Sequence, residues 1–166
     1  MNILQEAINN KLQYHSEQIG RLKELNNRNR EDNDLVWSEP RKLFKKKHGK
    51  KNFEPLGIPT STIGVYRIIY EPTMETMSIG VGTISQRLSV HKRMFINKGK
   101  TKIHNGTCTK SPAANHMYNY DRHRGHWLFS WCEVKNRSLA DEVERLLILT
   151  EQPEFNNLSM AGKQLI

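Results

Sequence analysis

The sequence contains few cysteines and no long apolar run, and both absences exclude classes of protein. Two cysteines in 166 residues cannot build the disulfide framework on which small secreted domains depend. The mean hydropathy is −0.73, and no apolar stretch approaches the ~20 residues that a membrane-spanning helix needs. Because no secretory signal is recognisable either, we expect a protein of the reducing cytoplasm with no membrane partner.

Acidic residues are in the minority as well, since 17 Asp and Glu oppose 26 Lys and Arg and leave a formal charge of +9. A basic chain attracts polyanions through phosphate contacts and counterion release, which favours nucleic acid as a partner. The charge is uneven: seven of the eleven residues from Arg41 to Lys51 are Lys or Arg. Such a run is typical of a flexible solvated linker, and it is also suited to following a DNA backbone. The residues expected to contact DNA are Lys45, Lys46, Lys47, Lys50, Lys51, Lys92 and Arg93.

The length and the 36% hydrophobic content are sufficient for one domain with a modest core and an extension. We expect residues 1–57 to form an N-terminal helix and a basic arm, and residues 58–166 to form the main domain. Glycine and proline interrupt the stretch from about 97 to 126, which we interpret as an insertion around one short helix over about residues 112–121. The apolar face of the N-terminal helix, which should pack against the main domain, consists of Ile8, Leu12, Ile19 and Leu22.

Three segments of the main domain are rich in β-branched and aromatic residues, as strands are. An apolar run begins at Gly64, turn residues follow from Glu71 to Thr76, and a second run begins at Ser78, which predicts a hairpin. The segment from about 127 to 134 is the third strand, and bulky side chains on both of its faces imply helices on both sides. The expected fold is therefore α+β: a small three-stranded antiparallel sheet flanked by helices.

Two predicted helices carry polar residues where an apolar stripe is expected. The first covers about residues 85–95 and places Arg87 and His91 among apolar neighbours. The second begins at Ser138 and places Glu144 on its apolar face. Charged groups enclosed in this way need partners, because burying an unpaired charge is strongly unfavourable. The two helices alone are equally consistent with a structural Arg87–Glu144 ion pair and with a catalytic or binding site.

Arg87, His91 and Glu144, taken together with the two strands of the predicted hairpin, resemble the conserved motifs of a known protein family. The sequence is similar to the GIY-YIG nuclease family, in which two tripeptides on adjacent strands precede an arginine and a histidine on the next helix and, later, a metal-binding glutamate. The resemblance covers about residues 63–157, with a middle stretch that does not align, and includes the family's closing Pro-x-aromatic-Asn at residues 153–156. The matching elements are Gly64-Val65-Tyr66, Ser78-Ile79-Gly80, Arg87, His91, Glu144 and Asn156.

The resemblance implies a DNA endonuclease that hydrolyses phosphodiester bonds with a divalent metal. In such an enzyme Tyr66 is the general base or orients the attacking water, with His91 as its neighbour or as the alternative base. Arg87 clamps the scissile phosphate, and Glu144 holds one Mg²⁺ (or Mn²⁺), because a lone carboxylate with phosphate and water suits a hard octahedral cation. Asn156 fixes the local loop or contacts a phosphate. Double-stranded DNA is the expected partner, and a homodimer is left open.

The second tripeptide departs from the family, because Ser78 occupies the position of its usual tyrosine. A serine hydroxyl can still hold a water or a phosphate oxygen, so Ser78 stays among the candidate catalytic residues.

We expect a sequence-specific type II restriction endonuclease working in a bacterium. The alternatives are a phage-encoded DNA endonuclease of relaxed specificity, working in the host cell, and a catalytically inactive DNA-binding module. Scattered residues also raise a zinc hypothesis, although their spacing matches no compact pattern: His104, Cys108, His116, His123, His126 and Cys132.

Overall fold

The computed structural model describes residues 12–21, 23–24, 35–44, 58–97, 103–104, 107–108 and 112–156. Its centre is an antiparallel sheet with the strand order β1-β6-β2-β3, so β2 lies between two partners and β3 forms one edge. The strands are β1 (Arg41–Lys42), β2 (Ile63–Tyr70), β3 (Glu75–Thr83) and β6 (Trp127–Glu133).

The α+β class, the hairpin and the antiparallel third long strand are confirmed, but the expected count of three strands is wrong. Arg41 and Lys42 pair with β6 as a short fourth strand. The residues that follow them, Leu43 and Phe44, are buried in the core. Charged side chains outnumber apolar ones in this run, which is why the sequence suggested a solvated arm; two buried side chains are enough to anchor its start. The rest of the run, including Lys45, Lys46, Lys47, Lys50 and Lys51, lies outside the described residues.

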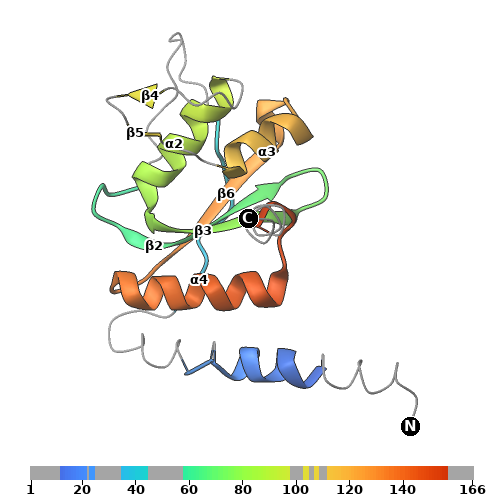
Figure 1. Cartoon of the computed structure of the whole chain (residues 1–166), viewed down its shortest axis with the longest axis vertical. Coiled ribbons are helices and arrows are strands. Elements are labelled where there is room, and N and C mark those ends of the chain that lie inside the picture. Colours follow the sequence, from blue (N-terminus) through green and yellow to red (C-terminus); the bar gives the residue numbers. More distant parts are fainter. Residues whose placement is uncertain are drawn as a thin grey trace, which may run out of the picture.

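Helices cover both faces of the sheet (Figure 1). α2 (Ile84–Ile96) and α3 (Pro112–Tyr120) contact each other on one face, and α4 (Arg137–Glu151) packs on the other. The N-terminal helix lies beyond α4. The remaining elements are β4 (Ile103–His104), β5 (Thr107–Cys108) and the 3-10 turn η1 (Arg124–His126). None of the helices in the described part of the chain combines the length and apolar character that crossing a bilayer requires.

The alternation of side chains along the strands divides the core into two clusters. On the α2 side, Tyr66 and Phe129 of the sheet pack with Leu88 and Phe95 of the helix. On the α4 side, a second cluster joins the opposite face of the sheet to the apolar stripe of that helix; its members include Val65, Ile79, Val81, Ala140, Val143 and Leu146. Burial of each large apolar side chain contributes roughly 1.5–3 kcal/mol, so both helices are held firmly at the sheet.

The start of α4 differs from the prediction. Its N-cap is Asn136, whose side-chain oxygen accepts a hydrogen bond from the backbone N–H of Leu139 at 2.9 Å. Ser138 therefore lies inside the helix rather than at its cap. An asparagine and a serine are both good N-caps, so the sequence did not decide between these starts.

The N-terminal helix also differs from the prediction. Within its described residues, 12–21 and 23–24, the side chain of Leu12 is 64% exposed and that of Ile19 is 49% exposed, whereas Gln18 is buried. The expected packing is therefore wrong for Leu12 and partial for Ile19, which lines a hollow together with Leu35, Trp37, Val143 and Leu147, while Ile8 and Leu22 lie outside the described side chains. Leu35 and Trp37, from the segment after the helix, pack against the α4-side cluster and take up part of the surface that the helix was expected to cover.

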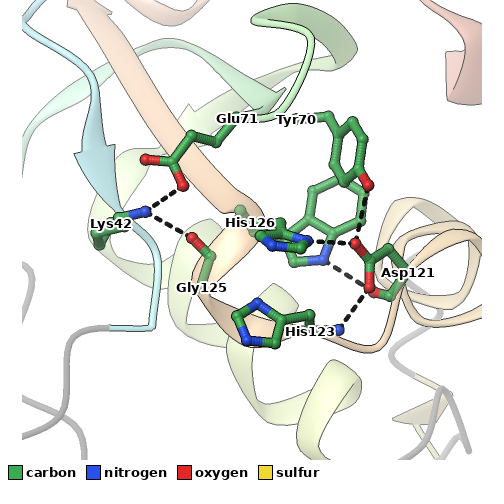
Figure 2. Close-up of polar contacts among 8 residues, drawn as sticks. Lys42, Tyr70, Glu71, Asp121, His123, Gly125 and His126 are labelled. Atoms are coloured by element: carbon green, nitrogen blue, oxygen red, sulfur yellow. Dashed lines mark hydrogen bonds and ion pairs between the residues drawn. The ribbon is translucent and has the colours of Figure 1, made fainter.

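A polar cluster ties the insertion to the end of the sheet (Figure 2). The Asp121 carboxylate accepts hydrogen bonds from Tyr70 Oη at 2.9 Å and from the backbone N–H of His123 at 2.7 Å, and it pairs with His126 Nδ1 at 2.5 Å. Burial opposes ionisation of Asp121, but these hydrogen bonds outweigh it and lower the pKa of the carboxyl group. The indole of Trp127 donates to the backbone carbonyl of Asp121 at 3.0 Å, which fixes the entry into β6.

Candidate functional site

Tyr66 lies in the middle of β2, opposite Gly80 of β3 and Trp131 of β6. Its phenol extends over Gly80: a Cβ atom built there would lie 2.5 Å from Cζ of Tyr66, a distance that real Cβ atoms essentially never show. The glycine of the second tripeptide therefore provides the space through which the phenol reaches toward the edge strand. Gly64 serves a different purpose, because a Cβ atom there would collide with the carbonyl oxygen of Cys132.

His91 is the partner of this phenol. The Tyr66 Oη atom lies 2.7 Å from Nε2 of His91, which α2 buries on the same side of the sheet. Burial, assisted by the charge of Arg87, lowers the pKa of His91 to about 4, so the imidazole is neutral at pH 7. Burial raises the pKa of Tyr66 to about 12, against the opposing influence of Arg87. A neutral phenol and a neutral imidazole thus share a hydrogen bond along which a proton can move.

Two arginine side chains lie over Gly82, the next glycine of the edge strand: the aliphatic part of Arg87 and the guanidinium of Arg137. A Cβ atom at Gly82 would be 3.1 Å from Cγ of Arg87 and 3.2 Å from Nη1 of Arg137. Gly82 also has a φ of 141°, a conformation that side chains strongly disfavour. Because α2 and α4 pack on opposite faces of the sheet, their arginines meet at its edge.

Arg87 is exposed, so the prediction that it points into the core is wrong. It lies one helical turn before His91 on the same side of α2, but nearer to the end of the helix, where the sheet no longer covers it. The helical period therefore identified the correct face and did not reveal where along the helix the burial ends.

Glu144 is half-buried on α4 and acts electrostatically on the same group of residues. Its charge raises the pKa of Tyr66, while the charges of Arg137 and Arg87 lower the pKa of Glu144 itself. Burial is the largest influence on this carboxyl group, Asp141 acts in the same direction, and the net pKa of Glu144 is raised. The contacts of the described residues include no direct ion pair between Glu144 and Arg87. The structure thus gives no support to the alternative of a purely structural Arg87–Glu144 bridge.

Glu144 is the carboxylate that this site offers to a cation. No group of three or more His, Cys, Asp or Glu side chains that could enclose a metal occurs in the described part of the chain. A single carboxylate oxygen donor leaves most of an octahedral shell to water and phosphate oxygens, which is how Mg²⁺ is commonly bound at phosphate sites. Glu144 is accordingly the residue that would hold such an ion.

Asn156 lies at the outer side of the edge strand and makes two hydrogen bonds to one residue. Its Oδ1 accepts from the backbone N–H of Ile79 at 2.8 Å, and its Nδ2 donates to the carbonyl of Ile79 at 2.9 Å. The side chain thereby satisfies the backbone of an otherwise unpaired edge position. Of the two roles expected for Asn156, these bonds support the one that fixes local structure.

The other predicted site residues differ in how far they are buried. Ser78 is buried opposite Ile68 and lies two residues before Gly80 on β3. Lys92 is half-buried on α2, where burial lowers its pKa, and Arg93 is exposed beside it. Four of the suggested zinc ligands are described, and they lie apart from the site. His116 stacks on Phe155, Cys132 is buried on the α4 side, and His123 and His126 belong to the Asp121 cluster. The side chains of His104 and Cys108 lie outside the described residues.

Arg137 is the site residue that the sequence analysis missed. It is the first residue of α4, which has no acidic residue in its first turn. A positive charge is unfavourable there, because the helix macrodipole is positive at its N-terminus. An arginine in this unfavourable position could have indicated a functional role. It was not recognised because the helix was expected to begin at Ser138, which places Arg137 outside it.

Comparison of the chain with family models, with curated proteins and with solved structures finds no match in any of the three. The chemistry of the site is therefore the guide to its function. It combines a hydrogen-bonded phenol and imidazole, two arginine side chains at the edge strand and a half-buried carboxylate. Such a set can bind an anion, accept a proton and hold a cation.

Proposed function

We propose that the protein is a divalent-metal-dependent DNA endonuclease that hydrolyses phosphodiester bonds. The observation that carries this proposal is the 2.7 Å contact between Tyr66 Oη and His91 Nε2 within the electrostatic reach of Arg87 and Glu144. Phosphodiester hydrolysis requires a proton acceptor, a group that stabilises charge on phosphorus and a cation near the leaving oxygen. These residues offer the first two directly and a place for the third.

Tyr66 and His91 form the proton-transfer pair in this proposal. A water molecule beside the phenol loses a proton to Tyr66 Oη as its oxygen bonds to phosphorus, while the phenol passes its own proton to Nε2 of His91. The P–O3′ bond breaks, and the 3′ oxygen takes up a proton from solvent or from the returning relay. A relay through Tyr66 avoids a free phenolate, which a pKa of about 12 makes rare at pH 7.

The substrate itself assists His91 in this scheme. In the free protein, burial first and then the Arg87 charge hold the pKa of His91 near 4. A DNA phosphate bound to Arg87 compensates that positive charge and raises the basicity of the imidazole. Proton transfer is thus favoured when DNA is bound and disfavoured when it is absent.

Arg87 binds the non-bridging oxygens of the scissile phosphate, because its exposed planar fork matches them in a bidentate manner. Glu144 would hold Mg²⁺ or Mn²⁺, and such an ion supplies charge neutralisation for the leaving oxygen. The net charge of +9 supports association with a duplex through its phosphates. We expect Arg93, and the Lys-rich run that begins after Phe44, to extend this contact.

Cleavage of supercoiled plasmid with Mg²⁺, and with EDTA as the metal-free control, tests the proposal. Glu144→Gln removes the charge of the metal ligand with little change of shape, and we expect its rate to fall about 10²-fold or more. Glu142→Gln is the matched control, since Glu142 is half-buried on the same helix, two residues and thus about 200° away. We expect Glu142→Gln to cleave like the native chain. If the native chain binds DNA and leaves it intact under these conditions, the inactive DNA-binding module is the correct reading.

The biological class of the nuclease is a separate part of the proposal. We propose a sequence-specific restriction endonuclease, with a phage-encoded enzyme of relaxed specificity as the alternative. Mapped ends that fall at one short palindrome would support restriction, because a two-fold symmetric dimer reads a symmetric sequence. Scattered ends would support the relaxed enzyme. A native molecular mass measured with and without DNA would decide the stoichiometry.

A further inference from the structure

Arg137 occupies the candidate site without having a counterpart among the residues that suggested a nuclease. Its Nε donates to Oδ1 of Asp141 at 2.9 Å, one helical turn away, and the side chain remains 56% exposed. Its Nη1 lies against Gly82, on the same patch of backbone as Cγ and Cδ of Arg87. The ion pair with Asp141 uses the Nε side of the guanidinium, which leaves donors on the Nη groups for a ligand.

The surroundings of Arg137 favour an anion. The side chains of Arg87 and Arg137 converge on one glycine, so an anion bound there would be attracted by two positive charges. The first turn of α4 adds the positive end of a helix dipole and contains no acidic residue. Arg137 also influences both Tyr66 and Glu144 electrostatically, so the charge acts inside the site rather than on a remote surface.

We propose that Arg137 binds the scissile phosphate together with Arg87, so that two guanidinium groups from opposite faces of the sheet hold its two non-bridging oxygens. This inference rests on the proposed phosphodiester hydrolysis. Two forks that approach from α2 and α4 fix the orientation of the phosphate as well as its position. The phosphorus then presents one defined side to the water at Tyr66, which a single arginine would not ensure.

Single-turnover cleavage of plasmid with Mg²⁺ tests this role. We expect Arg137→Gln to lower the rate about 10²-fold, as the loss of one charge-stabilising donor does. Arg145→Gln, at an exposed position of the same helix, removes the same charge and should cleave at close to the native rate. Arg137→Lys keeps the charge but not the fork and should give an intermediate rate. Thermal unfolding of each variant controls for the fold. An Arg137→Gln variant that is folded and cleaves like the native chain would overturn the inference.

Asp141→Asn separates phosphate binding from a merely structural ion pair. It removes the partner of Arg137 and leaves the guanidinium in place. If Arg137 served only to stabilise α4 through this pair, Asp141→Asn and Arg137→Gln would reduce cleavage equally, and the inference would be wrong. We expect the loss to be confined to Arg137→Gln.

A binding measurement keeps this test independent of catalysis. In EDTA, the logarithm of the affinity for a DNA duplex is measured over a series of salt concentrations for the native chain and for Arg137→Gln. We expect the slope to fall by about one unit if Arg137 contacts a phosphate. An unchanged slope would overturn the inference even in a cleaving enzyme. If the native chain does not cleave at all, the proposed hydrolysis fails, and the slope still decides whether Arg137 binds a phosphate.

Discussion

The phenol oxygen of Tyr66 and the Nε2 atom of His91 are 2.7 Å apart, and the side chains come from the central strand and from the helix that covers it. Their ring centroids are 5.4 Å apart and the ring planes lie at 61°, so the two rings also make an edge-to-face contact. Both groups are buried while the neighbouring Arg87 is exposed. The pair is thus protected from bulk water, while the arginine beside it is open to solvent.

The buried imidazole makes the stability of the protein sensitive to acid. The unfolded chain binds a proton at His91 with a pKa near 6.5, whereas the folded chain does so only near pH 4. Because the unfolded state binds more protons between these values, the free energy of unfolding falls as the pH is lowered from about 6.5 to about 4, by up to roughly 3 kcal/mol from this residue. Urea unfolding at several pH values in this window measures the effect.

His91→Gln is the control for that measurement, since glutamine can still hydrogen-bond to the phenol and does not titrate. We expect its stability to change less with pH than that of the native chain. All other residues are the same in both proteins, so the difference between the two curves belongs to residue 91. Identical pH dependence in the two proteins would contradict the assignment of a neutral buried imidazole.

Gly80→Ala tests the close approach between the edge strand and the phenol. The new methyl group would lie 2.5 Å from Cζ of Tyr66, so the ring must move and the contact with His91 must break. We expect cleavage to be lost and the unfolding temperature to fall, since overpacking typically costs about 1–3 kcal/mol. Gly20→Ala is the matched control, because a Cβ atom at Gly20 meets nothing within 4 Å. Native-like cleavage by Gly80→Ala would show that the phenol is not needed where the structure has it.

Asn156→Ala distinguishes a structural role for this residue from a phosphate contact. The change removes two hydrogen bonds to the backbone of Ile79, and we expect a loss of about 1–3 kcal/mol in the free energy of unfolding. The cleavage rate per folded molecule, and the salt dependence of DNA binding, should stay near the native values at a temperature where the variant is folded. A lower salt slope with unchanged stability would instead assign Asn156 to the DNA.

Local periodicity accounts for part of the arrangement of the candidate site. A hairpin register places Tyr66 opposite Gly80, and the helical period places Arg87 and His91 on one face. Arg137 escaped because its role depends on where α4 begins, and helix ends are the least certain part of a pattern. The strand β1 escaped because its pairing with β6 is a contact between distant parts of the chain, which no local pattern records.

The exposure of Leu12 has a similar cause. The spacing of Leu12 and Ile19 describes one face of a helix, but Leu35 and Trp37 share the surface that this face was expected to cover, so Ile19 reaches that surface while Leu12 stays 64% exposed. Competition between two apolar segments for one surface is decided by tertiary packing and cannot be read from either segment alone. The burial of Leu43 and Phe44 within a basic run illustrates the same limit.

The central claim, that the Tyr66 phenol works in phosphodiester hydrolysis, is tested most directly by single-turnover cleavage of plasmid DNA with Mg²⁺ by Tyr66→Phe. The phenylalanine ring still fills the core above Gly80, so the fold should be retained while the rate falls about 10²–10⁴-fold, as for the loss of a proton-transfer group. Tyr70→Phe, at the far end of the same strand, removes only the bond to Asp121 and should cleave like the native chain. Equal rates for Tyr66→Phe and the native chain, with both folded, would contradict the account.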